Sequence, residues 1–449
     1  MDEVRINLEE NLLDRLKGKI TLTQSVKTKE KIILNAFLEF CNVLENQKCE
    51  EREKYLKDEN SKTAFATGFQ SYGIIDSLLD DPNVEDIIIN GAEPIYVHHS
   101  LEGLKETGKQ FANARELDLL IKKILTFAGK ENLKKINNID LPGMRGRVNI
   151  IYSPLGPELT ITKMKSRPLS IIDLIEKGTL NTEIAAHLWL YIEGMGVKLA
   201  NILISGGPGS GKTTLLNALL SFVPNAQHIV VIEDSLELVT NWIGNVSRLE
   251  SDEDLSLADL VKNSLRMRPD RIIVGEVRGS EAEDMITAMN IGKYCMATIH
   301  ASTVRETIFR LQSNPMNIPE TLINLVDVFI VMRKMVVGHQ IFRVVDEIAE
   351  SAGLEQKVVL ISPLWKYDSA AQVINHLSPT TVYRDRLSRA SGLNGKNIFD
   401  EINQRKDFLE MLRQADVHLI QDVSHYCESY IQDPEIALRQ VSTLKEKSS

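Results

Sequence analysis

Eight residues with the spacing of a phosphate-binding loop form the sharpest motif in this sequence. Residues 206–213 read GGPGSGKT, a match to GxxxxGK[ST], and they lie between an apolar stretch at 200–205 and a helix-like stretch at 213–222. Glycines let successive backbone N–H groups turn toward phosphate oxygens, and the helix start adds partial positive charge there. Lys212 then reaches the β- and γ-phosphates, and the Thr213 hydroxyl is placed for Mg²⁺. The expected nucleotide-binding residues are Pro208, Gly209, Ser210, Gly211, Lys212, Thr213 and Thr214.

Carboxylates follow two further apolar stretches, at the ends where parallel strands bind their ligands. Residues 229–232 precede Glu233 and Glu237, and one of these two side chains is expected to orient or deprotonate an attacking water. The sequence leaves open which of the two acts. Residues 272–274 precede Glu276, which is expected to hold the Mg²⁺ shell through water.

A histidine and two arginines complete the set of candidate catalytic residues. His300 follows the apolar stretch 295–299 and is the first polar side chain able to point from that strand toward a γ-phosphate. Arg145 and Arg147 precede another apolar strand, outside the region of the nucleotide motif. From charge alone two arginines in a polar turn are a weak signal, because such side chains are most often solvated.

The elements that must position these residues follow from hydrophobic periodicity. Short apolar strands alternate with helices expected to start at Gly211, Ser256, Ser280 and Thr303, a pattern typical of a parallel sheet covered on both faces. Before it, short β-like runs flank one helix at 114–127. We therefore expect a helical N-terminal arm or small bundle at 1–66, an α+β domain at 67–165, an α/β P-loop domain with a parallel-rich sheet at 166–360, and a helical C-terminal region at 361–449.

Length and composition limit the class of protein. The chain has 449 residues, of which 43% are hydrophobic and 25% charged, values typical of a folded multidomain protein. A formal charge of −10 argues against a protein that coats nucleic acid. The four cysteines form no CxxC pair, the first residues are too charged for a signal peptide, and no run of 18 apolar residues occurs. We expect a cytoplasmic protein that reaches a membrane only through a partner.

Together these motifs resemble the type II/type IV secretion ATPase superfamily, which comprises RecA-like hexameric motors. The resemblance covers about residues 73–350. Beside the P-loop it rests on an Asp box at 232–238 (IEDSLEL), a Walker B stretch at 272–279 (IIVGEVRG) and a His box at 298–311 (TIHASTVRETIFRL). Several segments, among them RMRPDRIIVGEVRGSEA, look more like archaeal than bacterial members.

This resemblance implies a function and a set of partners. Its members hydrolyse ATP with Mg²⁺ as homohexamers and dock on a polytopic membrane platform protein that handles pilin-like or secreted substrates. A region matching GMRGRVNI supplies arginines to the nucleotide in such hexamers, which assigns that role to Arg145 and Arg147. The implied function is therefore a motor for assembly of a type IV pilus-like filament or for protein secretion.

Other functions remain open from the sequence. Archaellum rotation, within the same superfamily, is not separable from pilus assembly by these residues. A nucleic-acid-translocating RecA-like ATPase would need a basic channel, which a chain of charge −10 without a Lys/Arg cluster disfavours. A non-enzymatic nucleotide-binding scaffold is disfavoured because Lys212, Thr213, Glu276 and His300 are all present.

Overall fold

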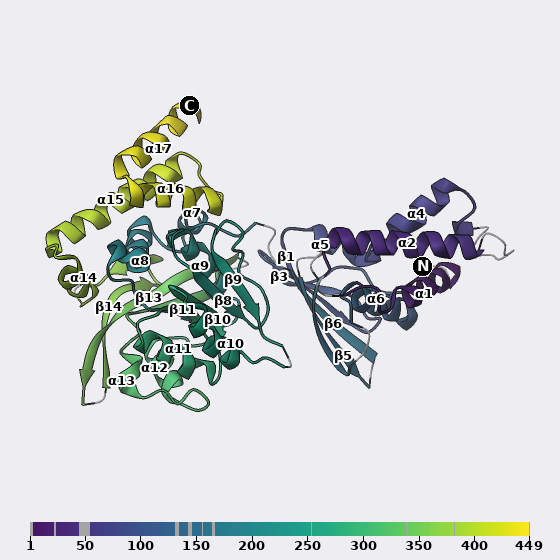
Figure 1. Cartoon of the computed structure of the whole chain (residues 1–449), viewed down its shortest axis with the longest axis horizontal. Helices are drawn as coiled ribbons and strands as arrows, with labels where there is room; N and C mark the ends of the chain where they lie inside the picture. The colour runs from purple at the N-terminus through teal and green to yellow at the C-terminus, as the bar shows by residue number, and fades with distance from the viewer. Residues whose placement is uncertain are drawn as a thin grey trace. The chain divides into compact units, whose positions relative to one another are not determined.

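The computed structural model describes residues 3–21, 24–44, 54–130, 134–141, 146–154, 156–163, 167–252, 254–337, 340–356, 358–380 and 382–448. The chain divides into two units, and Figure 1 shows their elements. The first unit contains Met1–Ser166 with His339–Ile341, and the second contains Arg167–Gly338 with Phe342–Ser449. Each unit has its own sheet and its own core.

The first unit is built on a six-stranded antiparallel sheet in the order β3-β2-β1-β6-β5-β4. Its strands are β1 (Val84–Asn90), β2 (Tyr96–His99), β3 (Gly103–Glu106), β4 (Ile136–Leu141), β5 (Gly146–Ser153) and β6 (Gly156–Lys163), with helices α5 (Asp76–Asp80) and α6 (Ala114–Phe127). Alternate residues of β1, β5 and β6 are apolar, so one face of the sheet is buried, and α6 packs against it. The edge strands β3 and β4 were not expected, because β3 is largely polar and the apolar residues of β4 do not alternate regularly with polar ones.

Three N-terminal helices pack beside α6. They are α1 (Glu3–Leu16), α2 (Val26–Leu44) and α4 (Glu59–Gln70). Their leucines and phenylalanines form one buried cluster that includes Leu119 of α6. A buried ion pair joins the same elements, since Lys123 Nζ of α6 lies 2.7 Å from Glu9 Oε2 of α1. Of the two interpretations of residues 1–66, the described part forms a bundle and not a separate arm.

The second unit contains a nine-stranded sheet in the order β15-β14-β13-β12-β7-β11-β10-β8-β9. Its first six strands along the chain are β7 (Ile202–Gly206), β8 (Ile229–Glu233), β9 (Val246–Glu250), β10 (Arg271–Val277), β11 (Tyr294–Ile299) and β12 (Val328–Val337). These six pair in parallel, so their carboxyl ends meet at one edge of the sheet. Strand β11 lies between β7, which leads into the P-loop, and β10, which carries Glu276.

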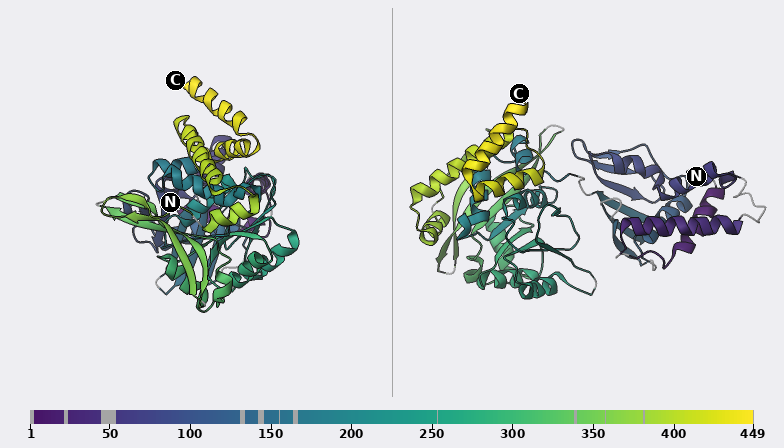
Figure 2. Two further views of the ribbon diagram at one scale, coloured as in Figure 1. Left: turned by 90° about the vertical axis from the view of Figure 1, so that its left-hand side faces the viewer. Right: turned by 45° about the horizontal axis from the view of Figure 1, so that its top comes forward.

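Helices cover both faces of this sheet (Figures 1 and 2). The central strands β7, β8 and β11 are largely apolar, and successive residues point to opposite faces: Ile202 and Ile204 of β7 join one core, whereas Leu203 joins the other. The first core holds α7 (Ile171–Glu176), α8 (Thr182–Glu193) and α9 (Lys212–Leu219). The second holds α10 (Leu257–Ser264), α11 (Glu281–Asn290), α12 (Val304–Gln312) and α13 (Glu320–Ile323).

The sheet continues beyond residue 360, where the sequence suggested a change to helices. Strand β13 (Gln340–Glu355) is followed by β14 (Val358–Asp368) and β15 (Val373–His376), and β14 pairs antiparallel with both. The expected boundary therefore falls inside β14. This strand was missed although residues 358–361 are apolar, because Pro363 interrupts the run and its hydrogen-bond partners are supplied by tertiary pairing.

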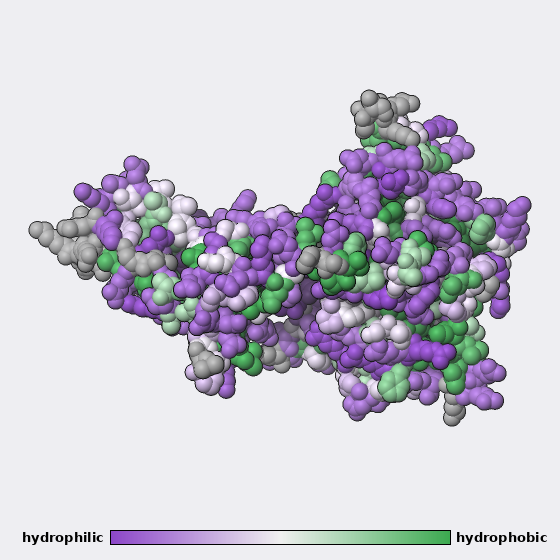
Figure 3. Space-filling view, turned by 180° about the vertical axis from the view of Figure 1, so that it is seen from behind, coloured by the Kyte–Doolittle hydropathy of each residue, from purple (hydrophilic) through white to green (hydrophobic). Residues whose placement is uncertain are grey.

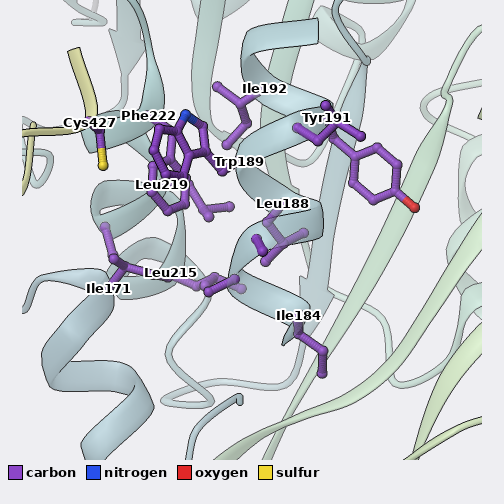
Figure 4. Packing of buried hydrophobic residues seen from close by; sticks show 14 of the residues in the cluster. Ile171, Ile184, Leu188, Trp189, Tyr191, Ile192, Leu215, Leu219, Phe222 and Cys427 are labelled. Atoms are coloured by element: carbon purple, nitrogen blue, oxygen red, sulfur yellow. The ribbon is translucent and has the colours of Figure 1, made fainter. Parts of the chain in front are cut away.

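The C-terminal helices pack into the core of the second unit. They are α14 (Val382–Ser391), α15 (Gly395–Gln414), α16 (Ile420–Gln432) and α17 (Pro434–Ser448). Figure 4 shows Trp189 of α8 beside Phe222, with the rings stacked at a centroid distance of 5.3 Å, and Cys427 of α16 facing the same cluster. Arg405 of α15 is buried over Trp189 and pairs with Glu193 at 2.7 Å. The ion pair between Arg405 and Glu193 therefore links α15 to α8.

The architecture confirms the expected fold class. It has an α/β domain with a parallel-rich sheet, a smaller α+β domain before it and a helical C-terminal region after it. Hydrophilic residues cover most of the face in Figure 3. Among the residues that the structure describes, no helix combines the length and hydropathy needed to span a bilayer.

Candidate nucleotide-binding site

The loop between β7 and α9 turns in a way that only glycine allows at several positions. Gly209 and Gly211 have φ values of +66° and +95°, which L side chains rarely adopt. A Cβ atom at Gly206 would lie 2.5 Å from the carbonyl oxygen of Met332 and would also collide with Ser210 Oγ. The glycines therefore let the chain curl tightly at the end of β7 and enter α9 at Lys212.

The groups in this loop suit a bound phosphate. Lys212 Nζ donates to the carbonyl oxygens of Gly206 (3.0 Å) and Gly207 (3.3 Å), and no described carboxylate forms an ion pair with it. Burial lowers the pKa of Lys212, although the charge of Glu276 opposes this shift. Ser210 Oγ is buried with no hydrogen-bond partner among the described residues. A cation without a direct counter-ion and an unpartnered hydroxyl, at a helix start, favour an anionic ligand.

His300 connects Lys212 to a carboxylate. It follows β11 directly, and its Nδ1 lies 3.3 Å from Lys212 Nζ, while its Nε2 lies 2.8 Å from Glu276 Oε1. An ammonium group only donates, so Nδ1 accepts and the ring proton sits on Nε2. Burial and the charge of Lys212 both lower the pKa of His300, which keeps the imidazole neutral at neutral pH.

Glu276 and Arg278 extend this chain of contacts. Both lie at the carboxyl end of β10, and Arg278 Nη2 donates to Glu276 Oε2 at 2.8 Å. Burial alone would raise the pKa of Glu276, but the hydrogen bond and charge of Arg278, with the charge of Lys212, lower it. The hydrogen bond to Glu276 in turn raises the pKa of Arg278. Glu276 is therefore ionised at neutral pH.

Glu233 and Glu237 have different environments. Glu233 is 2% exposed, and its Oε1 accepts from the backbone N–H groups of Glu237 and Leu238, at 2.9 Å each, while Oε2 lies 3.4 Å from Arg248. Burial raises the pKa of Glu233 to about 7 despite these donors. Oε1 of Glu233 therefore binds the turn that follows β8, and Oε2 lies near Arg248 of the neighbouring strand β9.

Glu237 lies four residues further along the same loop and is exposed to solvent. Its negative charge contributes to raising the pKa of Arg278, after the larger effects of Glu276 and Asp234, and it opposes the fall in the pKa of Lys212. Its carboxylate therefore lies within electrostatic reach of both cations. The two candidate carboxylates of the Asp box differ in exposure, which the sequence did not reveal.

The remaining loop residues occupy the places that the motif predicts. Thr213 and Thr214 are in the first turn of α9 and half-buried, and Pro208 is exposed at the loop tip beside Gly209. A Mg²⁺ ion bound with nucleotide fits these residues. Thr213 follows Lys212 in the first turn of α9, and the ionised Glu276 is linked to Lys212 by the contacts of His300.

Both arginines fall within residues 1–166, the range of the first unit. Arg145 lies outside the described residues. Arg147 is on β5 in the first unit, paired with Thr162 of β6 and Asp140 of β4.

Three basic side chains at the site were missed by sequence reasoning. Arg343 of β13 donates from Nε to the carbonyl oxygen of Gly209 at 2.9 Å, and Lys334 of β12 lies beside the same glycine. Arg310 of α12 donates to the carbonyl oxygen of His300. The strands β12 and β13 carried no recognised motif, so only the position of Arg343 and Lys334 next to the loop identifies them.

The chain is similar in sequence to a known protein family and to several known proteins. A family model described as "Type II/IV secretion system protein" matches residues 135–370, more than half of the chain. An uncharacterized protein of Methanocaldococcus jannaschii is 33% identical over 355 residues, 75% of this chain and 63% of that protein, so the match spans less than two thirds of that relative. The type IV secretion system protein VirB11 of Bartonella henselae is 31% identical over 271 residues, 51% of this chain and 75% of that protein. The solved structure of the Legionella pneumophila ATPase DotB is 19% identical, with a TM-score of 0.47, and the match covers 74% of this chain and 86% of that one.

Proposed function

The chain belongs to the family of type II/IV secretion system proteins, and we propose that it is an ATP-hydrolysing motor of this family. The family and the RecA-like fold class inferred from the sequence motifs are thereby confirmed. The proposed motor works as a homohexamer and powers assembly of a type IV pilus-like filament or protein secretion at the cytoplasmic membrane. Its partners are a polytopic platform protein and pilin-like or secreted substrates.

One observation carries the proposal: an unbroken set of contacts runs from Lys212 through His300 to Glu276 and Arg278. Lys212, His300 and the Glu276–Arg278 pair come from three different parts of the chain, and all meet at the carboxyl edge of the parallel strands. A nucleotide phosphate drawing Lys212 away from its carbonyl partners would break its contact with His300. The contacts therefore supply a route by which the presence of the γ-phosphate changes the surroundings of Glu276.

The roles of the residues follow from their surroundings. Lys212 and the N–H groups of the glycine loop neutralise charge that spreads over the phosphoryl oxygens in the transition state. Neutral His300 keeps its Nε2 close to Glu276, 2.8 Å from Oε1. Glu237, the exposed carboxylate, is assigned to the attacking water, and buried Glu233 to holding the loop that carries Glu237. Mg²⁺, held by Thr213 and through water by Glu276, supplies further charge neutralisation when bound.

Arg145 and Arg147 are proposed to act on the nucleotide in the assembled ring. Arginines supplied by a neighbouring domain or subunit raise phosphoryl-transfer rates by about 10³–10⁵-fold in other nucleotide hydrolases. An Arg147→Ala variant that hydrolyses ATP at the wild-type rate would contradict this assignment.

The decisive experiment measures ATPase activity per subunit against protein concentration in the presence of Mg²⁺. Three proteins are compared: wild type, Lys212→Ala, and Lys262→Ala as a matched control on the exposed surface of α10. We expect Lys212→Ala to lose about 10²-fold or more in rate, because the transition state loses its closest cation, while Lys262→Ala keeps the wild-type rate.

Assembly is tested in the same samples. We expect the rate per subunit of the wild type to rise with concentration, together with the appearance of a hexamer in analytical ultracentrifugation. Wild-type ATPase activity in the Lys212→Ala variant would refute the assignment of the site. A hexamer that never forms, at any concentration or with nucleotide, would refute the ring.

A further inference from the structure

A cavity lies in the second unit, between the sheet and the C-terminal helices, and its wall contains apolar as well as polar side chains. It measures about 260 Å³, enough for a small ion with several waters. Four elements contribute to its wall, namely α8, β15, α14 and α15. Five of its lining residues are polar or basic, namely His187, His376, Thr380, Arg384 and Lys396. None of them belongs to the nucleotide-binding site described above.

Positive charge dominates this wall. Arg384 pairs only with Asp385, its neighbour in the chain, and Lys396 makes no ion pair with any described residue. Gly395 and Lys396 also form the first turn of the 20-residue helix α15, whose N-cap Asn394 binds the N–H of Asn397. The N–H groups of Gly395 and Lys396 therefore remain available at the positive end of the helix.

The two histidines contribute the opposite kind of group, a hydrogen-bond acceptor. His187 is 3% exposed, and its Nδ1 lies 2.9 Å from the backbone oxygen of Glu183, which only accepts. The ring proton is thus on Nδ1, and Nε2 presents a lone pair with no described partner. Burial lowers the pKa of His187 to about 4, against the charge of Glu183 and with help from His376 and Lys406, so the ring is neutral at neutral pH. His376 differs, because its Nδ1 lies 3.2 Å from the side-chain carboxylate oxygen Oε1 of Glu183.

We propose that this cavity is a binding site for inorganic phosphate in its hydrogen phosphate form, HPO₄²⁻. Its unprotonated oxygens match Arg384, Lys396 and the start of α15, and its single hydroxyl donates to the unpartnered Nε2 of His187. Sulfate has the same shape and charge but no proton, so it cannot donate to that acceptor. The site goes beyond the proposed motor activity and does not depend on it.

The test uses a resonance next to the cavity. Trp365 contacts both histidines, with ring centroids 4.6 Å from His187 and 4.9 Å from His376. The full-length chain, carrying Lys212→Ala to weaken binding at the P-loop, is labelled with 6-fluorotryptophan, and its three tryptophans are followed by ¹⁹F NMR during titration with phosphate near neutral pH. A Trp365→Phe variant assigns the signal.

We expect a saturable shift of the Trp365 resonance with phosphate and little with sulfate at matched ionic strength. Adding Arg384→Ala and Lys396→Ala should weaken phosphate binding at least about tenfold, because charged hydrogen bonds are lost, whereas Lys262→Ala should not. Both arginine and lysine lie at the surface of the cavity, so the variant keeps its fold, and unchanged signals of Trp189 and Trp242 verify this.

His187→Asn provides a second, independent test. Asparagine keeps a donor toward Glu183 but lacks the acceptor at Nε2, so phosphate should lose its advantage over sulfate. No saturable shift, an equal response to sulfate in the parent, or a response retained by the Arg384/Lys396 variant would each overturn the proposal. Glycerol phosphate in place of inorganic phosphate identifies the source: weaker binding assigns the free ion, and tighter binding assigns the same group on an ester.

Discussion

Replacing Glu237 by glutamine is expected to lower the rate of ATP hydrolysis about 10²–10⁴-fold, the usual contribution of a general base. Glutamine has the same shape but cannot take a proton from water. Glu237 is exposed, so the free energy of unfolding should change by no more than about 0.5 kcal/mol. The loss of rate would therefore report on chemistry and not on folding.

Glu233 is the matched control in the same loop. Its Oε1 accepts two backbone N–H bonds of 2.9 Å in a buried place. Glu233→Ala leaves both donors without an acceptor, at about 1–3 kcal/mol each, and should destabilise the second unit by about 2–6 kcal/mol. Glu233→Gln keeps an oxygen for these donors. Because burial raises the pKa of Glu233 to about 7, the neutral acid is already populated near neutrality, and the amide resembles it.

The assay combines steady-state ATPase rates at saturating Mg²⁺-ATP with urea unfolding followed by circular dichroism. We expect Glu237→Gln to be stable and inactive, Glu233→Gln to be stable and active within severalfold of wild type, and Glu233→Ala to unfold at lower urea. A Glu233→Gln variant that is stable but as slow as Glu237→Gln would refute the reasoning, because the catalytic carboxylate would then be the buried one.

Three further predictions concern other parts of the chain. Because the pKa of His187 is lowered to about 4, its contribution to stability is present above pH 6.5 and is lost as the pH falls toward 4. The difference in free energy of unfolding between wild type and His187→Asn should therefore shrink by about 3 kcal/mol between pH 6.5 and pH 4. A difference that stays constant with pH in urea unfolding would contradict this. Arg343→Ala removes the hydrogen bond to the carbonyl oxygen of Gly209 and should raise the KM for ATP about tenfold, with Lys262→Ala unchanged; an unaltered KM would exclude a role in the loop. Glu9→Gln leaves Lys123 buried without a counter-charge and should destabilise the first unit by about 3–5 kcal/mol, whereas replacing both residues by methionine should recover most of the loss in urea unfolding.

Local signals located many elements of the second unit correctly. The helices expected from Ser256 and Thr303 begin with these residues as N-caps, each accepting a hydrogen bond from the N–H three residues on. A short polar side chain before an amphipathic run satisfies the free N–H groups of the first turn, so this signal is contained within four residues. The helix at 114–127 in the first unit was located for the same reason, with Asn113 as its cap.

Pairing between distant strands escaped the sequence. Strands β14 and β15 were taken for part of a helical region, because their residues show no apolar alternation and their hydrogen bonds come from tertiary pairing. The same limit applies to Arg343, whose contact with Gly209 joins residues 134 positions apart. Spacing along the chain carries no information on such contacts.

The sequence by itself determined the phosphate-binding loop, the family and the chemistry offered at the ends of the strands, because these depend on residue types at short, regular spacing. Tertiary structure alone decided which groups are buried. It placed Glu233 beneath its own loop with Gly275 against it and left Glu237 in solvent. It also brought Arg384 and Lys396 to the cavity that His187 lines. Burial sets the cost of charge and of an unpartnered polar atom, and it depends on what the rest of the chain packs against.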